Sequence, residues 1–442
     1  MLLGVLTSAA PRGHNVWRGT LRKSRVLAVA SIAALSLVAA ACGDSGTKAA
    51  STTTAAKASG TGGSASGTGG SGATTTAAGC KLDKAPKLIG LAEKPPEGPN
   101  AINDFSNGWD LALDGLTICG QKPDYERLPM SPTDAAAAKT NVLSALDKKA
   151  DVMFGIPSSA TILGVAADIK AGGTPIIFSS AGVTTFVGAP NSIGSEWGFV
   201  IRPRNVGAAS AQAEYLVKDL GKKKVGLICA TQAFGSQSCD ALKPVIEAAG
   251  GTIVSRQDVD QAATNLTTQI LALKSAGVDG VLTFIFPNSL VVGYNQAAEN
   301  GLNVPIFGGA SAGLAIATKN VTAAGLKNVW GADDCAPTLD ARAKDFLDKY
   351  KAKFAGAIPG YAAAEAYDEV MFAKAAIEKA GKLDHKAIAD AMRTVALKGV
   401  CADYSADAGQ GLNRAVSIES FDAAGLPKIE KTVAAPAPTG GG

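Results

Sequence analysis

The sequence predicts an α/β fold made of two doubly wound parallel-sheet lobes, and three observations lead to it. From Pro86 onward, short apolar runs alternate with amphipathic stretches, a pattern typical of parallel strands that helices cover on both faces. The body between Cys80 and Lys431 is long enough for two domains. A weak internal repeat indicates that the two domains are built alike.

The apolar runs, taken in order, predict strands over residues 87–91, 152–156, 175–179, 224–229, 252–258, 280–286, 305–308 and 329–332. The amphipathic segments predict helices near 105–113 and over 134–147, 161–171, 208–220, 236–249, 265–276 and 289–300. Three further helices, over 341–354, 361–380 and 385–394, precede a last strand over 416–421. Trp109, in the first helix, is either a wall of the cleft or part of the core, and we expect it to pack in the core.

The repeat consists of a strand, a Pro/Ser loop, a helix and a strand that opens with Pro-Ile, and its copies are 130 residues apart. The matching residues are Phe154, Pro157, Ser159, Pro175 and Ile176 in the first copy and Phe284, Pro287, Ser289, Pro305 and Ile306 in the second. Two such lobes facing each other form a cleft, and ligands of these sheets lie at the carboxyl ends of the strands. Both serine loops are therefore expected to face the cleft.

The first 41 residues resemble a bacterial lipoprotein signal. Arg22, Lys23 and Arg25 precede an uncharged apolar run over 26–41, which ends in small residues before Cys42. A new N-terminal cysteine supplies the thiol that lipid attachment requires, so we expect Cys42 to be lipidated. The alternative is an uncleaved transmembrane anchor. Either interpretation places the rest of the chain outside the cytoplasm, at a membrane surface.

Residues 42–79 are mainly Gly, Ser, Thr and Ala and predict a flexible tether, and residues 433–442 predict a disordered tail. The formal net charge of +4 comes from five basic residues that precede Cys42. Without them, 37 basic residues stand against 38 acidic ones. Because no basic excess is left to follow a nucleic-acid backbone, we expect no nucleic-acid partner.

Six cysteines follow Cys42, and an even number outside the cytoplasm favours disulfides. They are Cys80, Cys119, Cys229, Cys239, Cys335 and Cys401. Fifteen pairings are open; we expect sequence neighbours to pair, 80 with 119, 229 with 239 and 335 with 401. Zinc binding is the competing use, but no spacing of these residues resembles a ligand set, so we expect no metal.

The residues give little support to catalysis, and we expect a protein that is not an enzyme and has no cofactor. His385, at a polar helix start, is the single candidate base for a Ser-His-Asp arrangement, and we expect it to be exposed to solvent. Asp333 and Asp334 are a candidate acid–base couple, but adjacent acids usually mark a solvated loop, which is what we expect here.

Two loops carry candidate binding groups. Ser158 and Ser159 follow a strand and open a helix, where hydroxyls and free N–H groups can hold a carboxylate with help from the helix dipole. The alternative is that one of these serines simply caps the helix. The second loop, residues 179–182, offers the same kinds of group.

Short motifs in a fixed order lie at 214–216, 223–227, 234–235, 247–251, 273–279 and 304–309. In this order and spacing the chain resembles the extracytoplasmic solute-binding proteins of ABC importers with the type I fold, specifically the branched-chain amino-acid (leucine/isoleucine/valine-binding) family. The resemblance covers about residues 88–421.

This resemblance implies a three-segment hinge, with crossovers near Arg202 and Pro203, near 332–335 and after Cys401. It divides the body into an N-terminal lobe, 80–202 plus 335–401, and a C-terminal lobe, 203–334 plus 402–432. Cys335 and Cys401 then both lie near the hinge, which makes their pairing reasonable. The ligand-binding residues of the family map onto Ser158, Ser159, Ser180, Ala181, Gly182, Phe234, Phe286 and Ala310.

The chain departs from the family where the ligand is bound. Gly182 stands where the family commonly has Thr, and Phe234 and Phe286 stand in place of tyrosines. The acid that would pair with an amino-acid ammonium group falls at Ala310, and a buried ammonium without a countercharge costs several kcal/mol. Three loop acids are the candidates to replace this acid, although we expect them to lie on the solvated surface: Glu93, Glu97 and Asp104.

The expected protein is therefore a monomeric, lipid-anchored receptor on the outer face of the bacterial membrane. It would capture a small carboxylate, amide or other organic ligand that is not a standard zwitterionic amino acid, and deliver it to the subunits of an ABC permease. The alternative is the ligand-sensing lipoprotein of a signalling system, because one fold serves both roles.

Overall fold

We describe the protein from a computed structural model. It covers residues 80–92, 105–130, 135–156, 158–179, 181–182, 196–335, 340–355, 357, 359–407, 409–413 and 415–434. These residues belong to one compact unit, 72–442. The expected signal, Cys42, the tether and residues 435–442 of the expected tail lie outside them.

The first sheet has five parallel strands in the order β2-β1-β3-β4-β5. The strands are β1 (Lys87–Ala92), β2 (Asp124–Pro129), β3 (Val152–Gly155), β4 (Ile176–Phe178) and β5 (Gly198–Val200). Because side chains alternate along a strand, Val152 and Phe154 enter one core and Met153 enters another on the opposite face. Both faces are buried, as a doubly wound sheet requires.

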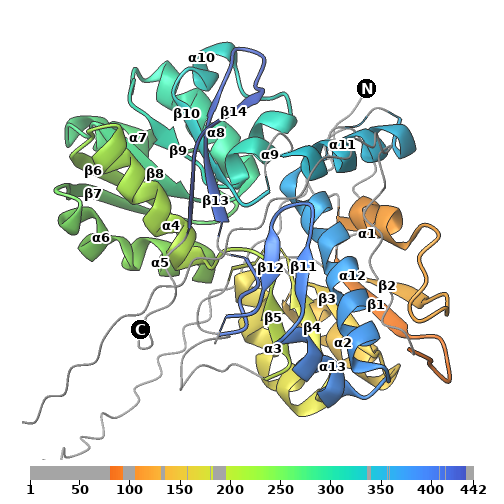
Figure 1. Cartoon of the computed structure of the whole chain (residues 1–442). Helices are drawn as coiled ribbons and strands as arrows, with labels where there is room; N and C mark the ends of the chain where they lie inside the picture. Colours follow the sequence, from red (N-terminus) through yellow and green to blue (C-terminus); the bar gives the residue numbers. More distant parts are fainter. Residues whose placement is uncertain are drawn as a thin grey trace, which may run out of the picture. The chain divides into compact units, whose positions relative to one another are not determined.

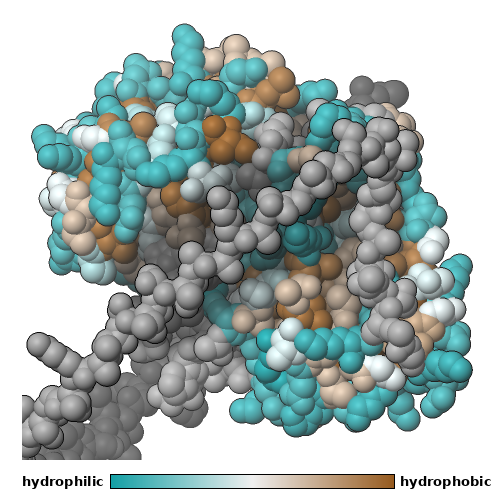
Figure 2. Space-filling view, viewed as in Figure 1, coloured by the Kyte–Doolittle hydropathy of each residue, from teal (hydrophilic) through white to brown (hydrophobic). Residues whose placement is uncertain are grey.

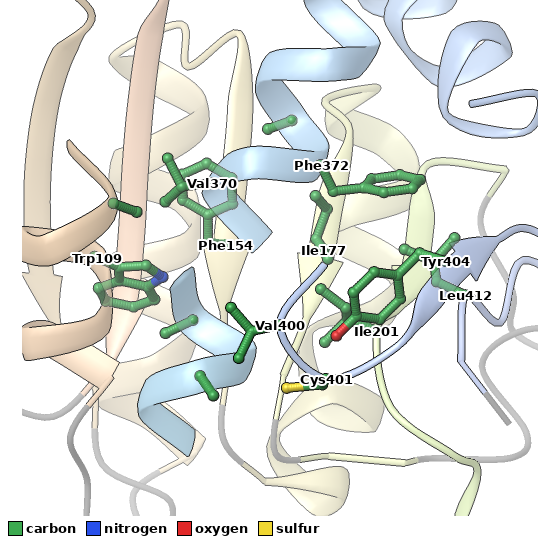
Figure 3. Close-up of a cluster of buried hydrophobic side chains, with 14 of the residues drawn as sticks. Trp109, Phe154, Ile177, Ile201, Val370, Phe372, Val400, Cys401, Tyr404 and Leu412 are labelled. Carbon is green, nitrogen blue, oxygen red and sulfur yellow. The ribbon is translucent and has the colours of Figure 1, made fainter. Parts of the chain in front are cut away.

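Helices from two distant parts of the sequence cover this sheet. α2 (Ala135–Asp147) and α3 (Ser159–Gly172) cover one face. The other face carries α1 (Phe105–Leu113) together with α11 (Ala341–Lys353), α12 (Tyr361–Ala380) and α13 (His385–Met392). α12 lies beside β3 (Figure 1), and its Val370 and Phe372 join Phe154 and Ile177 in the core (Figure 3). We call these elements the first lobe.

The second sheet has seven strands in the order β14-β13-β10-β9-β8-β6-β7. The parallel strands are β6 (Lys224–Ala230), β7 (Thr252–Val259), β8 (Gly280–Phe284), β9 (Ile306–Phe307) and β10 (Val329–Asp333). β13 (Ala415–Phe421) pairs antiparallel with β10, and β14 (Pro427–Ala434) pairs antiparallel with β13. This sheet also has a core on each face, since Leu227 and Ile228 enter different clusters.

The second lobe is this sheet together with the helices that pack on it. They are α4 (Asn205–Glu214), which continues into the π-helical turn η1 (Tyr215–Asp219), α5 (Ala233–Asp240), α6 (Leu242–Ala248), α7 (Thr267–Ser275), α8 (Pro287–Glu299), α9 (Ser311–Ala317) and α10 (Ala323–Leu326). On the face seen in Figure 2, hydrophilic residues dominate the outer surface of the described residues. None of the described helices combines the length and apolar character needed to cross a membrane.

The chain passes between the lobes three times: from β5 to α4, from β10 to α11, and into β13. The third passage lies later than expected. β12 (Asp403–Ser405) pairs with β11 (Ala396–Lys398), and Leu412 still packs in the core of the first lobe. The passage therefore lies between Leu412 and Ala415 rather than directly after Cys401, because β12 and Leu412 still belong to the first lobe.

All three expected disulfides are confirmed: Cys80–Cys119, Cys229–Cys239 and Cys335–Cys401. Trp109 is fully buried in the core of the first lobe, as predicted. The tail prediction is wrong at its start, because Val433 and Ala434 belong to β14 and pair with Val416 and Ala415. Strands β2, β5, β11, β12 and β14 and helices α9 and α10 were not predicted.

Candidate ligand-binding site

A cleft of about 770 Å³ lies between the lobes and is lined by residues of both. Ser159, at the start of α3, and Ser289, in the first turn of α8, both line it. These are matching positions of the internal repeat, and each follows a central strand of its sheet. The two serine loops therefore meet at one cleft, as the repeat predicts.

The serine loop of the first lobe is fixed by hydrogen bonds. Ser158 is the N-cap of α3, and its side chain accepts a hydrogen bond from the Thr161 N–H at 3.5 Å. Ser159 Oγ accepts a hydrogen bond from Asn205 Nδ2 at 3.1 Å. Both serines are buried and line the cleft. Ser158 thus caps the helix and also contributes to the cleft wall.

The second predicted loop contributes less to the described lining. Ser180 lies outside the described residues, and Ala181 and Gly182 are absent from the lining. Ala181 packs in the core under α3. The Gly182 carbonyl accepts a hydrogen bond from the Asn205 N–H at 2.6 Å. A Cβ at Gly182 would lie 2.5 Å from the Pro203 oxygen, so glycine allows this loop to pack against the first passage.

Three phenylalanines form an aromatic wall on the second lobe. Phe234 lies on α5, Phe284 ends β8, and Phe286 immediately precedes α8. The Phe234 ring meets those of Phe286 and Phe284 edge-on, with centroids 5.9 and 6.4 Å apart. All three line the cleft, opposite the serines of the first lobe. Such rings favour an apolar or ring-shaped part of a ligand.

Ala310, the third predicted residue of the second lobe, also lines the cleft and immediately precedes α9. Residues 309–313 read Gly-x-Ser-x-Gly, the pattern around some hydrolase nucleophiles, with Ser311 in the serine position. No histidine is found among the described residues that line the cleft. His385 is half-buried rather than exposed, because its Nδ1 forms a hydrogen bond with the Gly173 carbonyl at 2.9 Å.

The charged side chain in the described lining is Arg202, which sequence reasoning did not assign to the site. Its Nε and Nη2 lie 2.7 and 3.1 Å from the carboxylate oxygens of Asp334. Its guanidinium carbon lies 5.0 Å from the centroid of the Tyr361 ring. Although burial opposes the charge, Asp334 and Glu365 hold the pKa of Arg202 above its ordinary value. The countercharge of Arg202 is thus provided by the protein.

The adjacent acids Asp333 and Asp334 are buried, so the expectation of a solvated loop is wrong. They lie where the chain leaves β10 for the first lobe, and Arg202 compensates Asp334 there. Burial and the charge of Asp334 raise the pKa of Asp333, and burial with both aspartates raises the pKa of Glu419. Asp333 and Glu419 therefore favour the protonated form more than free carboxyl groups do.

Several uncharged cleft residues were also missed, among them Asn205 and Gln212. Asn205 connects the serine loop with the Gly182 loop, and Gln212 lines the cleft from α4. A single amide in a helix of small residues carries no sequence signal of binding. The sequence did contain a signal for Arg202, because it lies next to a proline at an expected crossover between the lobes.

Comparison with known proteins places this architecture in a family. Residues 131–424 match the family described as "Periplasmic binding protein". The "Leu/Ile/Val-binding protein homolog 8" of Brucella abortus (strain 2308) is 24% identical over 270 residues, which cover 57% of this chain and 66% of that relative. The chain thus spans just under two thirds of the length of this relative.

Two solved structures share the fold. The branched-chain amino-acid transporter substrate-binding protein LivJ of Streptococcus pneumoniae, in complex with isoleucine, has a TM-score of 0.68 at 21% identity and covers 79% of this chain and 99% of its own. A solute-binding protein of an ABC transporter from R. palustris, in complex with benzoate, has a TM-score of 0.70 at 17% identity and covers 79% and 97%. The chain belongs to the periplasmic binding protein family, with the two-lobed type I fold of its branched-chain amino-acid members.

Proposed function

We propose that this protein is a lipid-anchored receptor that captures a small organic solute between its lobes and delivers it to an ABC permease. The family supports an extracytoplasmic location and a solute-binding role. The small residues before Cys42 support lipid attachment. Capture would proceed by closure of the lobes around the ligand, with the three passages between the lobes as the hinge.

One observation carries the choice of solute: the described lining of the cleft contains no carboxylate, and its guanidinium is already paired with Asp334. An ammonium group buried in this lining would have no countercharge, at a cost of several kcal/mol. We therefore propose a solute without an ammonium group, such as a carboxylate or an amide, whose apolar part contacts Phe234 and Phe286. Ser158 and Ser159 would bind its polar end, and Ala310 leaves space beside it.

A thermal-shift screen of the purified protein against amino acids, small carboxylates, amides and aromatic acids tests this proposal. A ligand that binds only the folded state increases the free energy of unfolding by RT ln(1 + [L]/Kd), and this raises the melting temperature. We expect carboxylates or amides to stabilise the protein and leucine, isoleucine and valine not to do so.

Isothermal titration calorimetry of each hit would then give the dissociation constant. Stabilisation by a branched-chain amino acid alone would contradict the proposed solute class and would support binding of branched-chain amino acids instead. Turnover of any hit, followed by mass spectrometry, would contradict the expectation that the protein is not an enzyme.

A further inference from the structure

Gln212 has an unsatisfied acceptor at the wall of the cleft. The residue lies on α4 and its side chain is almost fully buried, at 2% exposure. Its Nε2 donates a hydrogen bond to the Ala208 carbonyl at 3.1 Å. Because a carbonyl oxygen can only accept, this bond fixes the orientation of the amide and turns Oε1 away from Ala208. Oε1 has no hydrogen-bond partner among the described residues.

An unsatisfied buried acceptor is costly and uncommon in folded proteins, because the oxygen has lost its water without gaining a donor. Gln212 lines the cleft, so its amide lies at the wall that a bound molecule would contact, although Oε1 itself has almost no accessible surface in this structure. A donor on a bound ligand would supply the hydrogen bond that the protein does not provide.

The position of this amide relates it to the missing family acid. A Cβ added at Gly309 would lie 3.5 Å from Gln212 Nε2 and 3.7 Å from Oε1, so the amide lies against Gly309. The next residue, Ala310, holds the position where the family resemblance places the acid. An uncharged acceptor thus lies beside the site at which an ammonium-binding carboxylate is expected.

We infer that Gln212 determines the specificity of the cleft: its side-chain oxygen accepts a hydrogen bond from a neutral O–H or N–H group of the solute and favours such solutes over their ammonium analogues. This inference rests on the proposed function and narrows it. The solute class is a 2-hydroxy acid, in which a neutral hydroxyl replaces the amino group. A neutral oxygen satisfies such a donor fully, whereas an ammonium group would remain without a countercharge.

Two sets of compounds that differ only in this donor provide the test. The first set is 2-hydroxy-4-methylpentanoate, 4-methylpentanoate and leucine, and the second is 3-phenyllactate, 3-phenylpropanoate and phenylalanine. Their dissociation constants would be measured by calorimetry at pH 7.5 with the wild-type protein and Gln212→Met, which removes the acceptor at nearly constant size. Gln269→Met, on α7 outside the cleft lining, is the matched control.

We expect a hydroxy compound to bind wild-type protein about tenfold more tightly than its donor-free analogue, as one hydrogen bond typically gives. Gln212→Met should abolish that difference by weakening the hydroxy compound alone, and Gln269→Met should preserve it. Gln212→Glu, which adds a carboxylate, should improve binding of the amino-acid member about tenfold relative to the hydroxy member. That variant tests the same role if the methionine variant fails to fold.

Tightest binding of leucine or phenylalanine by the wild-type protein would overturn the inference. So would a preference for the hydroxy compound that survives in Gln212→Met. Binding of other compounds from the wider screen, with none from these sets, would overturn the role of Gln212 but leave the proposed receptor function intact. Failure of every compound to bind would count against both.

Discussion

Two neighbouring residues of α12 carry buried carboxyl groups that have different hydrogen-bond partners, one on each side of the helix. Asp368 and Glu369 are both completely buried. Asp368 accepts hydrogen bonds from the N–H groups of Val400 and Cys401 at 2.8 and 2.9 Å and from the Tyr404 hydroxyl at 2.8 Å. Glu369 accepts one from Trp109 Nε1 at 2.9 Å. Figure 3 shows Trp109 and Tyr404 at opposite ends of this core.

Burial and the hydrogen bonds that each carboxyl group accepts together set which form the fold prefers. Burial raises the pKa of Asp368 to about 6, a rise that its three donors limit. Burial raises the pKa of Glu369 to about 8, although Trp109, Ser179 and the Gly155 backbone oppose this rise. Asp368 is thus mainly ionised at pH 7, and as an acceptor it binds the segment 400–404. Glu369 is mainly neutral and behaves as a polar core residue.

The largest effect is expected from Asp368→Ala, which leaves two N–H groups and a hydroxyl without their acceptor. We expect the free energy of unfolding to fall by about 3–5 kcal/mol, measured by urea denaturation at pH 7.5. Asp368→Asn keeps one acceptor oxygen and should lose about 1–3 kcal/mol. Equal losses in the two variants would show that packing, rather than hydrogen bonding, explains the role of Asp368.

The Cys335–Cys401 disulfide holds the same segment covalently and closes a loop of 66 residues. Replacing both cysteines by serine should lower the free energy of unfolding by about 2–4 kcal/mol. Removing Cys229–Cys239, with a separation of 10 residues, should cost less. When the Cys335/Cys401 change is combined with Asp368→Asn, the loss of stability should differ from the sum of the two separate losses, because both changes act on the Cys401 turn. Strict additivity would contradict their cooperation.

The smallest effect is expected from Glu369→Gln, and it depends on pH. The folded pKa of about 8 lies above the ordinary value of 4.5, so the folded state keeps a proton that the unfolded state loses between these values. The contribution of Glu369 to stability therefore falls as pH rises from about 4.5 to about 8, by at most about 1.4 kcal/mol per pH unit.

Glu369→Gln carries the neutral form at every pH and should flatten this fall. We expect the variant to equal the wild type at pH 5 and to be more stable at pH 8 by about 1–3 kcal/mol, measured by urea unfolding at both values. Asp368→Asn should leave the slope between pH 7 and 8 unchanged, because Asp368 is already mainly ionised there. A Glu369→Gln variant with the wild-type slope would show that Glu369 is ionised in the folded protein.

The sequence predicted the parts of the fold that depend on continuous apolar runs or strong helical periodicity. Strands β3, β6 and β8 are buried along nearly their whole length and have such runs. β2 was missed because it is an edge strand with partly exposed residues and the sequence Asp-Tyr-Glu-Arg-Leu-Pro. β5 has three residues, too few to show a pattern.

The lining of the cleft was predictable where the internal repeat or the family resemblance reached it. Ser158, Ser159, Phe234, Phe286 and Ala310 all line the cleft. Arg202 and Gln212 were missed because their importance depends on partners distant in sequence or on the absence of a partner. Asp333 and Asp334 misled for the same reason, since adjacent acids look solvated until the arginine that pairs with one of them is known.

The third passage between the lobes has a consequence for the order in which the chain folds. Val200, at the end of the first sheet, forms a bridge with Gly411, and the second sheet is completed by β13 and β14. Synthesis thus supplies the last pieces of both lobes only after about residue 410. Neither lobe can therefore complete its folding before the other, and both must fold to completion once almost the whole polypeptide has been released.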